Sequence, residues 1–67
     1  MSARIASRIE RYVEAVRALA GLRRAQTLEP ETDRSSAILL ARSDVRQAEA
    51  LLTGGALAKA RRILNGG

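Results

Sequence analysis

The stretch TLEPETDRSSAILL, residues 27–40, separates two segments that both show the spacing of amphipathic helices. Its first half is rich in residues that favour turns and helix starts over helix interiors. Pro30 suits the first turn of a helix because its missing N–H has no intrahelical partner there, and the acidic residues after it complement the positive end of the helix dipole. We therefore predict a connector over 27–30 and a helix from 30 onward, with Asp33 or Thr32 as the cap if the helix begins later.

The segment before this stretch places its apolar residues at steps of four and three. This spacing brings side chains onto one face of a helix. Ser2 can accept a backbone N–H at the start, and no residue breaks the pattern before the connector. We predict a first helix over 3–26, whose apolar face carries Ile5, Ile9, Tyr12, Val16 and Leu19.

The segment after the connector repeats the same rhythm, and we predict a second helix over 30–53. We expect Thr53-Gly54-Gly55 to end this helix, because Gly readily adopts the left-handed conformation that closes many helices. A short third helix is predicted over 56–64. The apolar face of the second helix carries Ile38, Ala41, Val45, Ala48 and Leu52.

These elements predict an all-α protein, a single small domain over 1–67, built on an antiparallel helical hairpin. Ala41 and Ala48 lie one heptad apart, so they let the two long helices approach closely. The short connector brings the second helix back antiparallel to the first. Some apolar side chains stay outside the hairpin contact, and we expect them to complete a helical bundle by association, on the face of Tyr12, Leu19, Leu39, Leu40 and Leu51.

The composition argues against an enzyme and against a metal or cofactor site. The chain has no Cys and no His, so the commonest thiolate ligand, general base and imidazole ligand are missing. Glu10 and Glu14 lie one turn apart, but opposite the apolar face and beside Arg17, as in a solvated salt-bridging surface. We predict no catalytic residue, no cofactor and no metal.

Positive charge is concentrated at the two ends of the chain. Lys and Arg outnumber Asp and Glu by 12 to 7. Arg4, Arg8 and Arg11 form a row along the first helix that can follow nucleic-acid phosphates. Alternatively, their aliphatic stems shield apolar flanks while the charged heads remain in water. The chain has a single aromatic residue, so no aromatic pair can stack on bases.

Together these features predict a small non-enzymatic interaction protein, such as an adaptor, co-chaperone or regulatory subunit. Its apolar helix face would dock on a protein partner or on a second copy. The alternative is a dimeric four-helix regulator that binds nucleic acid through the Arg row. The apolar runs are shorter than the roughly 20 residues that cross a bilayer, and Trp and Phe are absent, so we expect no membrane binding and a cytoplasmic location.

Overall fold

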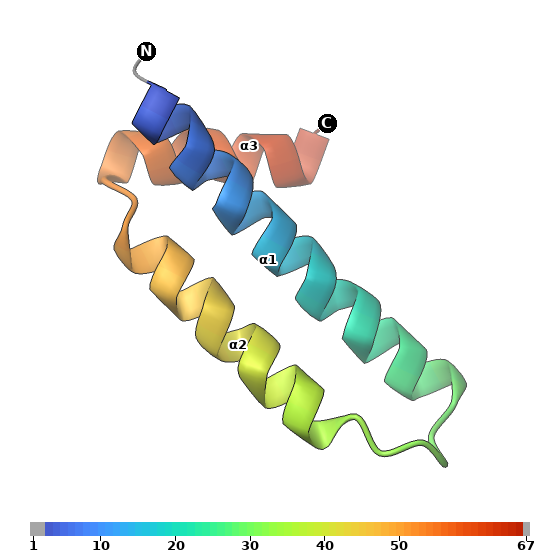
Figure 1. Ribbon diagram of the computed structural model, residues 1–67. Helices are drawn as coiled ribbons and strands as arrows, with labels where there is room; N and C mark the ends of the chain where they lie inside the picture. Colours follow the sequence, from blue (N-terminus) through green and yellow to red (C-terminus); the bar gives the residue numbers. More distant parts are fainter. Residues whose placement is uncertain (1–2, 67) are drawn as a thin grey trace.

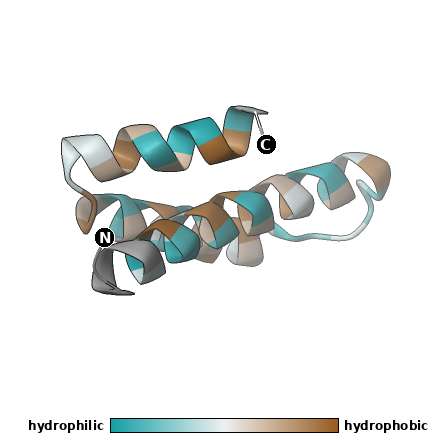
Figure 2. Cartoon of the chain, turned by 90° about the horizontal axis from the view of Figure 1, so that it is seen from above, coloured by the Kyte–Doolittle hydropathy of each residue, from teal (hydrophilic) through white to brown (hydrophobic). Residues whose placement is uncertain are grey.

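The computed structural model describes the backbone of residues 3–66 and the side chains of residues 7–66. These residues form three helices and no strand, which confirms the all-α prediction: α1 (Ala3–Leu28), α2 (Ser35–Ala50) and α3 (Gly54–Gly66). The two long helices run side by side in opposite directions (Figure 1). α3 lies across one side of this hairpin, near the end where α1 begins (Figures 1 and 2).

The hydrophobic core lies where the three helices meet. Its buried residues come from α1 (Ile9, Tyr12, Val13), α2 (Ala48) and α3 (Ala60). The two alanines are the most completely enclosed, with exposed fractions of 1% and 0%. Around them pack half-buried residues that close the contact between the helices: Val16, Val45, Leu52, Ala56, Leu57 and Leu64.

α3 covers only part of the hairpin. At about 1.5 Å of rise per residue, a helix of 13 residues is half the length of α1, which has 26. Beyond α3 the molecule is a single layer of two helices, and Ala20, on the side of α1 that would face an extended α3, is exposed. The whole molecule is therefore elongated, with extents of 44 × 23 × 17 Å.

The connector is longer than predicted, because α2 begins at Ser35 and not at Pro30. Pro30 lies in a turn, and polar contacts across the connector fix the later start. The N–H of Arg34 donates to Oε1 of Gln26 at 2.9 Å, and its guanidinium donates to the carbonyl of Ala25 and to the carboxylate of Glu29. Through its bonds to Ala25 and Gln26, Arg34 joins the end of α1 to the start of α2.

Asp33, the alternative cap, lies next to this new start. Its Oδ1 accepts the backbone N–H of Ser35 at 2.9 Å and the Ser35 hydroxyl at 2.6 Å. The hydroxyl bond and then the backbone bond hold the pKa of the Asp33 carboxyl below its ordinary value. The carboxylate thus provides a partner for one N–H that the first turn of α2 leaves unpaired.

The prediction that Thr53-Gly54-Gly55 ends the second helix through a left-handed glycine is wrong. α2 ends at Ala50, where the N–H groups of Leu51 and Leu52 bond back to carbonyls three residues earlier and tighten the chain. Gly54 does not adopt the left-handed conformation and is the first residue of α3. The carbonyl of Thr53 accepts the N–H of Leu57 at 2.8 Å, so this segment starts a helix instead of ending one.

Candidate interaction surface

The residues on each side of α1 show which neighbouring helix that side faces. Glu10, Val13 and Arg17 line a hollow together with Ile63 of α3, so they mark the side that faces α3. Gln26 bonds to Arg34 and marks the side that faces α2. Steps of four, three and four along the helix place Arg11, Ala15, Ala18 and Leu22 in one row, which points away from α3 and borders the α2 side, because Gln26 is one turn after Leu22.

The same assignment works for α2. Arg46 and Ala50 line a hollow with Leu57 of α3, and Leu39 lies on this side because it is two helical turns before Arg46. Ala41 and Ala48 are buried against the rest of the molecule. The remaining side carries Ala37, Leu40 and Asp44. Leu51 continues this row just after the end of α2, where it lines a hollow with Arg8 and with Ala56 of α3.

These two rows lie on the same side of the hairpin, away from α3, and we call them together the open face. It consists of Arg11, Ala15, Ala18 and Leu22 of α1, Ala37, Leu40 and Asp44 of α2, and Leu51 just after α2. Ala15 and Leu22 are half-buried and the other six are exposed, including Leu40 at 69% and Leu51 at 44%. Six of these eight residues are apolar, and Arg11 and Asp44 bring one charge of each sign. Two further polar residues, Arg8 beside Leu51 and Gln47 one turn before it, lie at the end of this face that is nearest α3.

The structure separates the five residues that the sequence assigned to an interaction face. Tyr12 is buried in the core, with an exposed fraction of 7%, and is not available to a partner. Leu19 is half-buried, and Leu39 lies on the α3 side of α2. Only Leu40 and Leu51 share the open face.

Burial of Tyr12 has a clear cause. Tyr12 belongs to the core where α3 crosses the hairpin and Ala60 contacts it. The sequence does not show where the short third helix crosses, so the apolar positions next to that crossing could not be told from exposed ones. The row of Arg11, Ala15, Ala18 and Leu22 repeats at helical spacing, but alanines give a weak apolar signal, so sequence reasoning misses this row.

Of the predicted Arg row, the structure describes the side chains of Arg8 and Arg11, whereas Arg4 lies outside the described side chains. Arg8 lines a hollow with Leu51, Leu52, Thr53 and Ala56, as expected for an arginine stem that covers apolar residues. Arg11 is exposed on the open face. The two residues therefore have different surroundings.

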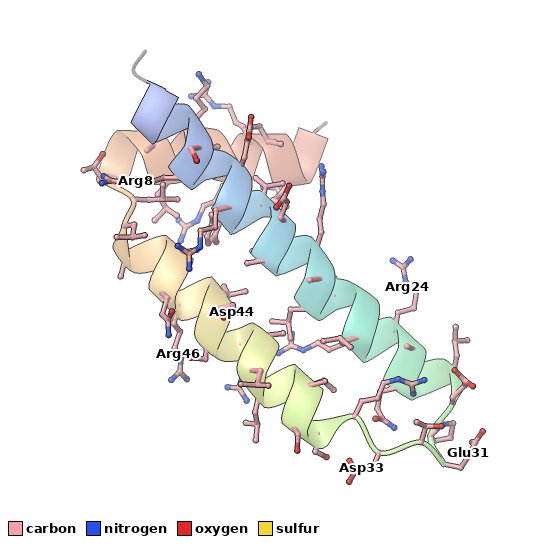
Figure 3. The ribbon with its side chains drawn as sticks, viewed as in Figure 1. Arg8, Arg24, Glu31, Asp33, Asp44 and Arg46 are labelled. Atoms are coloured by element: carbon pink, nitrogen blue, oxygen red, sulfur yellow. The ribbon has the colours of Figure 1, made fainter. Side chains whose placement is uncertain are left out.

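Charged side chains are mostly exposed. Arg34 and Glu29 form an ion pair at 2.9 Å across the connector. Neither Arg11 nor Asp44 has a side-chain hydrogen bond or ion pair with another described residue. Arg24 and Arg46 project from opposite edges of the hairpin, while Glu31 and Asp33 lie at the connector (Figure 3).

The described residues do not assemble a metal site, since no three His, Cys, Asp or Glu side chains gather within that part of the chain. None of the described helices has the length and apolar character that are needed to span a bilayer. A scan against protein-family models and searches of curated proteins and solved structures found no match to this chain. The surface itself is therefore the basis for a function.

Proposed function

We propose that this chain is a non-enzymatic helical interaction protein, which docks its open face on a protein surface. One observation carries the proposal. The chain exposes 4962 Å², whereas a compact folded monomer of its 7.2 kDa mass exposes about 4,100 Å². The radius of gyration, 13.3 Å, likewise exceeds the value of about 11 Å for a compact chain of this length.

The excess of about 800 Å² matches the area that one partner contributes to a standard protein interface. The exposed apolar side chains are found where such an interface could form. Leu40 and Leu51 are exposed at 69% and 44% on a side with few charges, and burial of apolar area is the main driving force of association. An adaptor, co-chaperone or regulatory subunit needs a surface of this kind.

An affinity capture from a native cell extract tests the proposal, with and without nuclease. We expect captured proteins that survive nuclease with the parent chain and are lost with Leu40→Lys. Leu39→Lys is the matched control, because Leu39 is the neighbouring leucine and is almost as exposed, at 62%, but lies on the α3 side. Equal capture by all three chains would contradict docking through the open face.

Nucleic-acid binding is the second candidate, favoured by the excess of basic residues and by exposed arginines. Arg8 and Arg11 form no ion pair with a described carboxylate, so their charges are available to phosphates. In this case capture would be lost on nuclease treatment. Binding to RNA or DNA would then fall steeply with salt, and Arg8→Glu with Arg11→Glu would abolish it.

A further inference from the structure

The open face has the properties that a symmetric contact requires. In a two-fold dimer the same patch lies on both subunits, so it must complement itself. The excess of about 800 Å² per chain comes from the elongated shape of the molecule, and it is similar in size to the share of each subunit in a standard interface of about 1,600 Å². The open face also supplies both members of an ion pair, Arg11 and Asp44, which have no partner among the described residues.

Two face-to-face arrangements satisfy two-fold symmetry for a pair of hairpins. In one, α1 packs on α1 of the second copy, and in the other it packs on α2 of the second copy. Charge distinguishes them, because α1 contains six Arg and two Glu whereas α2 contains equal numbers of basic and acidic residues. Like charges across an interface oppose association, so packing of α1 on α2 is favoured.

The register of the hairpin places the opposite charges within reach in this arrangement. The bond between Gln26 and Arg34 sets which residues of α1 and α2 are level, and puts Arg11 level with Glu49. Asp44 is five residues from Glu49 in the sequence, roughly 7.5 Å along the helix axis. An arginine side chain spans most of this distance, and the symmetry forms the contact twice.

We infer that the open face is covered by a second copy of this chain, with α1 of each subunit packed on α2 of the other in a four-helix arrangement. This inference rests on the proposed function and names the partner of the same surface. In it, Leu40 packs against Ala18 and Leu22 of the second copy, and Leu51 packs beside the stem of Arg11 of the second copy. Arg11 of each subunit pairs with Asp44 of the other.

Sedimentation equilibrium of the full chain over a micromolar to submillimolar range tests this. We expect a species of twice the 7.2 kDa chain mass. Leu40→Lys should weaken dimerisation by about tenfold or more, because it buries an unpaired charge, whereas Leu39→Lys should change it by less than about threefold. Circular dichroism of both variants checks that the helices remain, which is expected because both leucines are exposed.

Exchanging the charges of Arg11 and Asp44 tests whether α1 packs on α2 of the second copy. Arg11→Asp and Asp44→Arg should each weaken the dimer by roughly fivefold or more, since each leaves like charges facing one another, and the double variant should restore the parent affinity. Three outcomes would each overturn the inference. The parent chain could stay monomeric throughout, the two leucine variants could weaken dimerisation equally, or the double charge variant could dimerise no more tightly than the single ones. If the parent is monomeric but Leu40→Lys still loses captured protein, the proposed function stands and the self-association fails.

Discussion

At the scale of single residues, alanine is what allows these helices to pack closely. Ala48 is exposed by only 1% and lies in the core with residues of α1 and α3. Replacing it with Leu adds methylene groups where the backbones approach, and such overpacking typically costs about 1 to 3 kcal/mol. We expect a lower midpoint in thermal denaturation. Gln47→Leu, one residue away but exposed, should leave the midpoint nearly unchanged, and equal effects of both variants would show that Ala48 is not at a close contact.

Also at this scale, Asp33 makes stability depend on pH. Hydrogen bonds from Ser35 depress the pKa of its carboxyl, so the folded state favours the ionised form more than the unfolded state does. The stabilisation is therefore complete above the ordinary Asp pKa and is lost as pH falls through the lowered pKa. An NMR titration should find the Asp33 pKa below the ordinary value, and Ser35→Ala should raise it. Ser36→Ala is the control and should not, because Ser36 does not bond to Asp33.

At the scale of helices, Gly21 weakens α1 without a structural need. It lies inside the helix, is not in the left-handed conformation, and a Cβ added there would meet no atom within 4 Å. Gly21→Ala should stabilise the fold by about 0.5 to 1 kcal/mol, because alanine loses less backbone entropy in a helix. Denaturant unfolding measures this. The reverse change at the exposed neighbour, Ala20→Gly, should lower the free energy of unfolding by a similar amount. If both changes raised the free energy of unfolding, the argument from helix propensity would be contradicted.

The number and type of helices were predictable because apolar periodicity is a local property. Their ends were not, since Arg34 bonds to Gln26 and Ala25 only after the two helices have come together. Likewise, no local pattern distinguishes Leu39 from Leu40, because the difference depends on which side of the hairpin α3 covers. The burial of Tyr12 depends on the same crossing.

At the scale of the whole molecule, stability should be unevenly distributed, because the core lies at one end of the hairpin. Amide hydrogen exchange should be slowest near the three-helix contact, over residues 9–16 and 45–48, and faster over 20–28 and 35–40, where two helices form a single layer. A second copy on the open face would change this pattern. Residues 18–25 and 37–44 should then gain protection as concentration rises, while amides beside α3 change little. Uniform and concentration-independent protection along α1 would mean that the hairpin end is as stable as the core, and would remove the reason for a partner there.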